Sequence, residues 1–412
     1  MMLKRLAAIL LIYVFTCIAW GILGATIFAR THSLDTALKG AVAQIWGNVQ
    51  TQLQPSLSYK VPRLQEVKRT ENGRTVTETK TVWDTVDLPI SSSSIDVKLH
   101  LDPRQKGLLW YATYRVAFAG RYQVVNDTGA PRRITFVYSF PAHSAVYDDF
   151  RLMVGDQERK QLTLGGGLVT AGFDLAPGAS QVVSVAYTTQ GLDQWWYDFG
   201  ENVHQVRNFA LAMATDFDKI DFPPQSISPT AKEKIAGGWR LTWAFTNLLT
   251  SVKIGLTMPQ KLNPGPWVGQ VTLTAPISLF LFLFFMFVVT SLRKIPLHPM
   301  HYFFLSAAYF SFHLLLAYLV DHLSIEASMA IASVVAVLLT TTYMRLVVDN
   351  RFAFGEVAIA QLVYLVLFSY TFFLEGYTGL AITILGIATL LVVMQMTGRL
   401  DWDEVFGRKG PA

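Results

Sequence analysis

Apolar residues are distributed very unevenly along this chain. One apolar segment opens it, a long and mostly polar stretch follows, and five more apolar segments crowd into the C-terminal third. The first segment is too long for a cleaved signal peptide and lacks a small-residue cleavage site, so we expect a retained anchor. A bilayer core of roughly 30 Å needs about 20 apolar residues in a helix. We therefore predict six spans, at residues 6–28, 271–292, 302–320, 327–343, 355–374 and 377–397.

The basic residues around these segments predict their orientation. Lys4 and Arg5 precede the first span, and Lys or Arg recurs in the loops expected on the same side. The two short loops on the other side, 321–326 and 375–376, contain acids and no Lys or Arg. This asymmetry follows the positive-inside rule. We expect both termini in the cytoplasm and residues 31–270 outside it, in the periplasm where the cell has one.

The polar stretch changes from a helical to a strand-like pattern. Apolar residues from Leu34 to Leu53 recur three and four apart, which predicts an amphipathic helix. A period of two follows, and Asn72-Gly73 within 66–82 predicts a hairpin. The serine run 91–94 is interpreted as a short loop. Further strands are expected at 111–125, 132–140, 161–169, 181–188 and within 239–258.

Many short strands at fairly even spacing favour a β-sandwich. The predicted fold is therefore a mixed membrane protein, with six transmembrane helices and a large exported all-β, sandwich-like domain. The predicted parts are an anchor at 1–30, an amphipathic helix and hairpin at 31–90, the β-sandwich at 91–270, five helices at 271–400 and a cytoplasmic tail at 401–412.

Charge and motifs exclude several classes of function. The formal net charge is +5, and the exported stretch is only mildly basic with interspersed signs, which argues against nucleic-acid binding. The chain lacks G-x-S-x-G, H-E-x-x-H, P-loop and G-x-G-x-x-G motifs. Cys17 is the only cysteine and lies in the first span, so the exported domain has no disulfide. We expect no enzyme activity, no catalytic residues, no metal and no cofactor.

Three ionisable residues of the helical segments are candidates for function. His313 lies in the middle of a span, where an ionisable side chain usually faces the bundle interior. The simpler interpretation is a neutral imidazole bonded to a Ser, Thr or Tyr of a neighbouring helix, and the alternative is a proton relay or substrate contact. Asp321 and Glu375 lie at outer helix ends, either as exposed acids or as a cluster that meets basic residues of the exported domain.

Trp195 and Trp196 are further candidates because they lie in an unusually aromatic stretch. Indole rings are favoured at membrane interfaces, but they also fill cores and stack on carbohydrates or protein partners. We favour a core or interface position for this pair over a ligand site.

Several motifs resemble the bacterial inner-membrane CreD family. Residues 293–302 read RKIPLHPMHY, similar to the family's basic, His-Pro, Tyr segment, and Asp321-His322 stands where the family has Glu-His. LEGY at 374–377 resembles its Glu-Asp-Tyr loop with Gly in place of Asp, and RLDW at 399–402 matches its closing Arg-x-Asp-Trp. Weaker similarities lie at 45–50, 106–108, 114–116 and 120–122.

The resemblance implies a setting rather than a reaction. The family is linked to envelope integrity, to colicin tolerance and to the Cre two-component system, and no enzymatic reaction is assigned to it. We therefore expect a non-catalytic inner-membrane envelope protein, surrounded by lipid, whose periplasmic β domain contacts an envelope component or protein partner. The alternative is a transporter or channel subunit in which His313, Glu356, Gln361 and Gln395 line a polar path.

Overall fold

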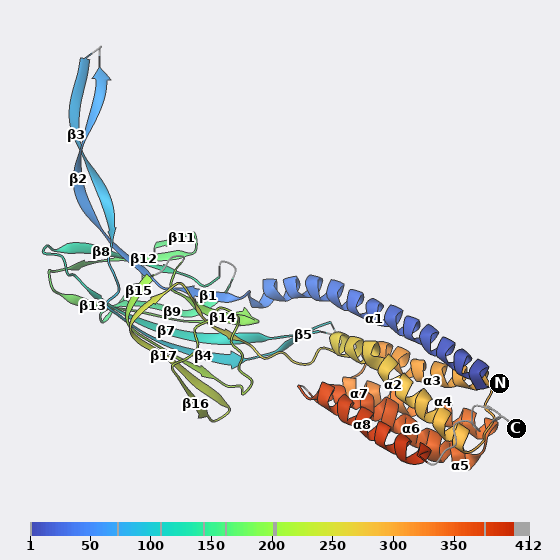
Figure 1. Ribbon diagram of the computed structural model, residues 1–412. Helices are drawn as coiled ribbons and strands as arrows, with labels where there is room; N and C mark the ends of the chain where they lie inside the picture. The colour runs from blue at the N-terminus through green and yellow to red at the C-terminus, as the bar shows by residue number, and fades with distance from the viewer. Residues whose placement is uncertain are drawn as a thin grey trace. The chain divides into compact units, whose positions relative to one another are not determined.

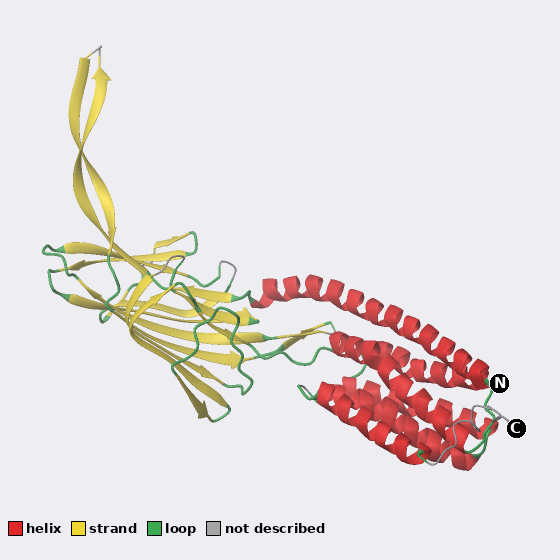
Figure 2. Cartoon of the chain, in the orientation of Figure 1, coloured by secondary structure: helices red, strands yellow, loops and turns green. Residues whose placement is uncertain are grey.

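The structure is a computed structural model that describes residues 2–71, 74–107, 109–142, 145–160, 163–200, 204–374 and 376–398. Contacts divide the chain into two compact units. The helical unit comprises Met1–Thr36 and Leu262–Ala412, and the β-rich unit comprises Ala37–Lys261. Helices and strands are thus largely segregated along the chain (Figure 1, Figure 2). The division falls near, but not at, the predicted boundaries at residues 30 and 270.

The described residues contain six helices that are long and apolar enough to cross a membrane, which confirms the predicted spans. Five of them are regular α-helices: α1 (Met2–Trp46), α2 (Pro264–Leu292), α3 (Pro299–Leu319), α4 (Ile325–Val347) and α8 (Thr378–Thr397). The prediction that the helix after the first span extends to Leu53 is wrong, because α1 ends at Trp46. Gly47 follows α1 with a φ of 114°, which glycine adopts readily, and Gln50–Leu53 then forms strand β1.

The remaining span, Asn350–Phe373, changes its hydrogen-bonding pattern several times. π-helical turns shift carbonyl groups out of the α-helical pattern and leave them free for other partners. The Tyr364 carbonyl in the second π segment accepts a hydrogen bond from the Tyr309 hydroxyl of α3 (2.5 Å). The segments are α5 (Asn350–Phe352), η1 (Ala353–Val357), α6 (Ala358–Gln361), η2 (Leu362–Leu367), α7 (Phe368–Tyr370) and the 3-10 helix η3 (Thr371–Phe373).

The β-rich unit contains four sheets in its described part. The largest has the order β10-β9-β13-β7-β4-β15-β17-β16, the next β11-β12-β8-β2-β3, the third β1-β14-β18, and the smallest pairs β5 with β6. The strands are β2 (Ser56–Glu71), β3 (Arg74–Asp87), β4 (Ser92–Leu101), β5 (Arg104–Lys106), β6 (Leu109–Tyr111), β7 (Thr113–Val125), β8 (Arg132–Ser139), β9 (Tyr147–Val154), β10 (Gln157–Glu158), β11 (Thr163–Gly165), β12 (Leu168–Leu175), β13 (Ser180–Leu192), β14 (Gln194–Asp198), β15 (His204–Thr215), β16 (Ala231–Ile235), β17 (Gly238–Thr250) and β18 (Ile254–Thr257).

The two larger sheets contribute to one hydrophobic core. Burial alternates residue by residue along β4 and β7, as a strand with one covered face requires. Aromatic rings join the two sheets across this core. The ring centroids of Tyr122 in β7 and Phe136 in β8 lie 6.1 Å apart, and those of Tyr187 in β13 and Tyr138 in β8 lie 6.4 Å apart. The predicted large β-rich domain is therefore confirmed.

Two local predictions in this unit are wrong. The serine run 91–94 is not a loop, because β4 begins at Ser92 and lies between β7 and β15, where Ser93 is buried. The strand predicted at 161–169 is divided between β11 and β12 by a turn at Gly166 and Gly167, both with positive φ. The predicted hairpin is present as β2–β3, although its Asn72-Gly73 turn lies outside the described residues.

Gln52 forms a polar centre inside the β-rich core. Its side chain is fully buried, and its Oε1 accepts hydrogen bonds from the hydroxyls of Tyr138 (2.6 Å) and Tyr187 (2.7 Å). Its Nε2 donates to the carbonyls of Leu53 (2.7 Å) and Ser139 (3.2 Å). Burial raises the pKa of both phenols well above the usual value, so both stay protonated and donate. One amide thereby ties β1 to β8 and β13.

Gln52→Leu is expected to destabilise the β-rich unit by about 2 kcal/mol or more, because it leaves two buried hydroxyls without an acceptor. Gln65→Leu, on the exposed part of β2, is the matched control and should stay within about 0.5 kcal/mol of the parent. Denaturant unfolding of the full chain, followed by near-ultraviolet circular dichroism, measures both. Equal effects of the two substitutions would contradict the role given to Gln52.

Candidate functional site

His313 lies in the interior of the helical unit. It is 1% exposed on α3, and its ring is surrounded by aromatic groups, with centroid distances of 5.2 Å to Trp20 and 4.9 Å to Phe312. Its Nδ1 lies 3.3 Å from the carbonyl oxygen of Tyr309, one turn earlier on the same helix. The predicted interior position is therefore found, but the hydrogen-bond partner is the residue's own helix rather than a neighbouring one.

Other polar side chains form hydrogen bonds between the helices. Ser278 of α2 and Tyr309 of α3 contact each other, and both reach the Tyr364 carbonyl. His301 Nδ1 of α3 lies 2.7 Å from the Tyr343 hydroxyl of α4. Trp267 Nε1 of α2 donates to the Phe372 carbonyl (3.1 Å). These contacts hold the bundle together in an environment that supplies no water.

The residues predicted to line a transport path are spread over several environments. Gln361 is buried and donates to the Ala336 carbonyl of α4 (3.2 Å). Glu356 forms an ion pair with Arg293, and Gln395 is exposed on α8. Among the described residues, no hydrogen bond or ion pair joins these side chains to one another or to His313.

Asp321 has a well-defined partner on α1. Its Oδ2 lies 2.9 Å from Arg30 Nη1, while Arg30 Nη2 also donates to Asp321 Oδ1 (3.4 Å) and to the Ala317 carbonyl (3.3 Å). The Arg30 guanidinium lies 5.8 Å from the Tyr318 ring centre. Glu375, the other predicted acid, lies outside the described residues. Asp321 therefore joins two helices of the helical unit.

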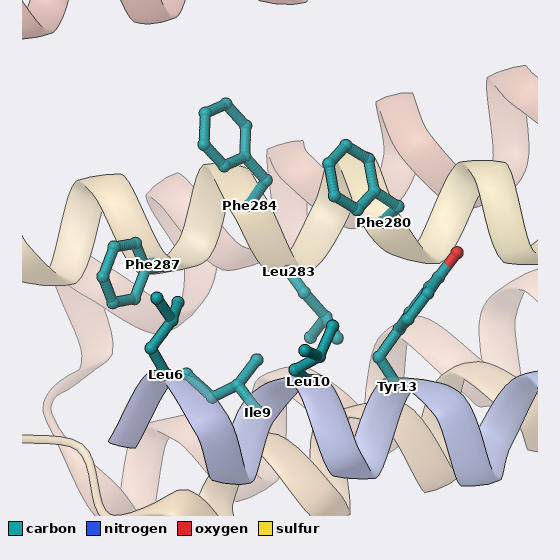
Figure 3. A pocket seen from close by; sticks show the side chains of 8 residues that line it. All are labelled: Leu6, Ile9, Leu10, Tyr13, Phe280, Leu283, Phe284 and Phe287. Carbon is teal, nitrogen blue, oxygen red and sulfur yellow. The ribbon is translucent and has the colours of Figure 1, made fainter. Parts of the chain in front are cut away.

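An apolar pocket of about 240 Å³ opens between α1 and α2 (Figure 3). The Tyr13 hydroxyl, the one side-chain oxygen in its lining, donates to the Pro276 carbonyl (3.2 Å) and leaves the pocket wall made of carbon. Such a wall on two membrane spans is suited to contact with lipid chains. The lining residues are Leu6, Ile9, Leu10, Tyr13, Phe280, Leu283, Phe284 and Phe287.

The two tryptophans of β14 lie on opposite faces of the sheet β1-β14-β18, because neighbouring strand residues alternate. Trp195 is 0% exposed and belongs to the core, next to Gln50 of β1 and Leu256 of β18. Trp196 is half-buried and stands in a row with Thr51 of β1 and Gly255 of β18. The predicted core position is thus found for Trp195, whereas Trp196 lies at the surface of the unit.

Trp196 lines a groove of about 620 Å³, a volume typical of small-molecule sites. The ring fits there because Gly255 has no side chain: a Cβ on Gly255 would lie 2.5 Å from Trp196 Cε3. The indole Nε1 donates to Gln194 Oε1 (3.1 Å), which fixes the ring further. The groove, named below the Trp196 groove, is lined by Thr51, Trp196, Pro224, Gln225, Ser251, Val252 and Lys253.

The charges at the Trp196 groove compensate each other. Lys253 Nζ lies 2.7 Å from Asp198 Oδ2, and Asp198 Oδ1 also accepts from the Gly200 amide (2.9 Å). Lys253 is the only charged residue in the lining. Within the described part of the chain, no group of three or more His, Cys, Asp or Glu residues could hold a metal ion.

Sequence reasoning missed most of this groove. The doublet Trp195-Trp196 was visible, and alternation along a strand would have separated a buried ring from a surface ring. Thr51, Gln225 and Gly255 come from three distant segments, and only strand pairing and the turn at Pro224 bring them together.

Asp321→Arg is expected to lower the melting temperature of the full chain, because it places a second cation beside Arg30. The loss corresponds to about 1 kcal/mol, and the exchange Arg30→Asp/Asp321→Arg should recover most of it. Glu326→Gln, at an exposed position of α4, is the control for a neighbouring acid and should have little effect. An exchange variant no more stable than Asp321→Arg would argue against this ion pair.

Part of the helical unit is similar to a known protein family. The family model described as inner membrane protein CreD matches residues 275–403. No curated protein matches the chain. One similar solved structure is a Legionella pneumophila protein, described provisionally as a nutrient binding protein, with 9% identity and a TM-score of 0.35, covering 46% of this chain and 77% of that one. That likeness is too weak to carry an argument. The family match agrees with the resemblance seen in the sequence: residues 275–403 are similar to the inner membrane protein CreD family.

Proposed function

We propose that this protein is a non-catalytic component of envelope integrity, whose β-rich unit lies on the periplasmic side and contacts a protein partner. The distribution of Lys and Arg supports this orientation, with both termini in the cytoplasm. The family match supports the setting. The lack of catalytic motifs in the sequence supports a binding role, and the shared core of the two larger sheets supports a sandwich-like domain.

The observation that carries partner contact is the β2–β3 ribbon. The two strands pair with each other from Ser58 to Glu71 and from Arg74 to Asp87, but only Ser56–Tyr59 also pairs with β8. Beyond that point the ribbon extends away from the other sheets of the β-rich unit (Figure 1). An isolated two-stranded ribbon is only marginally stable in water, so a covering partner would stabilise it.

One face of the ribbon carries apolar side chains in the open. Leu64 is 73% exposed and Trp83 is 58% exposed. Pro62 pairs directly with Trp83 in the register, and Leu64 lies two residues further along the same face. Large apolar groups exposed together commonly mark protein interaction sites. We therefore place the contact with an envelope protein on the face formed by Pro62, Leu64 and Trp83.

The test is complementation of a deletion strain, scored by sensitivity to colicin-type toxins, detergent and β-lactam. The intact chain should restore resistance, whereas Leu64→Ser/Trp83→Ser should restore little of it at equal expression. Val82→Ser, on the opposite face of the same ribbon, is the matched control and should behave like the intact chain. Full rescue by the double variant would remove the ribbon face from the proposal, and a deletion strain without phenotype would contradict the envelope role.

A further inference from the structure

We propose that the Trp196 groove binds a neutral saccharide, with one face of a pyranose ring stacked on the Trp196 indole. The inference rests on the proposed periplasmic role and deepens it, because it names the chemical class of an envelope component that the β-rich unit would recognise. It concerns a different surface from the ribbon face, so the two can succeed or fail separately.

The floor of the groove provides an aromatic platform. Thr51, Trp196 and Gly255 lie side by side across three paired strands, and the ring lies against the sheet at Gly255. Pro223 packs at the same position, since a Cβ on Gly255 would also lie 2.9 Å from Pro223 Cγ. An indole face is electron-rich, and the C–H groups on one face of a pyranose are apolar and weakly positive. The two surfaces are therefore complementary in shape and in charge.

The lining also supplies hydrogen-bonding groups of the kind that sugar hydroxyls require. Thr51 and Ser251 carry hydroxyls that donate and accept, and Gln225 carries an amide that does both. Within the described part of the chain, these three side chains make no hydrogen bond to other protein groups. The Trp196 Nε1, by contrast, is already engaged with Gln194, so the indole is available as a stacking surface rather than as a donor.

The backbone at Gln225 indicates that its side chain has a role. Gln225 has a φ of 62°, the left-handed region in which glycine is favoured, and it directly follows Pro224 in an exposed turn. A non-glycine residue there costs roughly 1–2 kcal/mol of conformational energy. Strained residues of this kind cluster at binding sites. The long polar side chain of Gln225 in this turn fits a contact with a ligand in the groove.

Charge selects a neutral ligand over an anionic one. Lys253, the only cation in the lining, is neutralised by Asp198 at 2.7 Å. The Asp198 side chain is 11% exposed and also accepts a hydrogen bond from the Gly200 amide. Both of its carboxylate oxygens therefore have partners within the protein. A phosphate or carboxylate would have to displace this ion pair, whereas a hydroxyl-rich neutral ring would not.

The test is isothermal titration calorimetry with the full chain in lipid nanodiscs, because maltoside detergents are themselves saccharides. The probes are N-acetylated chitotriose, cellotriose and maltotriose, with a proline-rich peptide as the competing ligand class. We expect at least one of the saccharides to bind and the peptide not to bind.

Three variants locate the binding. Trp196→Ala should weaken saccharide affinity by at least about tenfold, because the stacking surface is lost. Trp83→Ala, which removes an exposed indole from the ribbon face, is the matched control and should leave affinity unchanged. Gln225→Gly should weaken binding by about fivefold without loss of stability, because glycine suits the left-handed backbone. Because Gln225→Gly should fold normally, weaker binding by this variant cannot be attributed to a misfolded groove.

Absence of binding by all three saccharides would overturn the proposal. Binding of the peptide that is lost in Trp196→Ala would overturn it as well, because the groove would then be a peptide site. Saccharide affinity that survives in Trp196→Ala would also overturn it. None of these results bears on the partner contact, which the ribbon variants test in cells. Loss of complementation by Leu64→Ser/Trp83→Ser together with intact saccharide binding would show that the two surfaces act independently.

Discussion

Polar groups that enter a bilayer must find their partners within the protein, and this constraint organises the helical unit. Ser278, Tyr309 and the Tyr364 carbonyl satisfy one another across three helices. The Tyr364 carbonyl lies in the π-helical segment η2 of the fifth span, and such segments often occur at functional positions of a helix. His313 sits beside this group among aromatic rings and bonds to its own helix. Hydrogen bonds between helices thus account for part of the polar interior of the bundle.

Buried polar groups must also be satisfied in the β-rich unit. There the two faces of the three-stranded sheet β1-β14-β18 differ, because one faces the core and the other faces the Trp196 groove. On its inner face, Gln52 bonds to Tyr138 and Tyr187 and fixes β1 in the core. On its outer face, the same strand places Thr51 beside Trp196. The buried network therefore holds the groove floor in position, and the groove depends on side chains that never reach it. A fixed floor reduces the ordering cost that the protein itself would have on binding a ligand.

Sequence patterns predicted the elements that depend on hydrophobicity alone and missed those that depend on pairing. The six spans follow from the hydrophobicity of their segments. The interior position of His313 follows from the free-energy cost of exposing an ionisable side chain to lipid. The central strand β4 was missed because its opening serines resemble a loop, although neighbours on both sides pair with it. The end of α1 was misplaced because Val49 and Leu53 continue the helical spacing of apolar residues, whereas Gln50 and Gln52 belong to a strand and enter the core. Gln225 follows Pro223-Pro224, which mark a break in the chain but do not indicate that the turn borders this groove.

The central claim is that the β-rich unit lies on the outer side of the inner membrane. The most direct measurement is labelling with a membrane-impermeant maleimide in a Cys17→Ser background, which removes the only native cysteine. Single cysteines replace Gly129, in an exposed turn of the β-rich unit where a side chain meets no neighbour, and Arg351, exposed in α5 at the start of the fifth span. The account predicts labelling at position 129 in cells with a permeabilised outer membrane, and labelling at 351 only after lysis. Labelling at 351 with protection at 129 would contradict it.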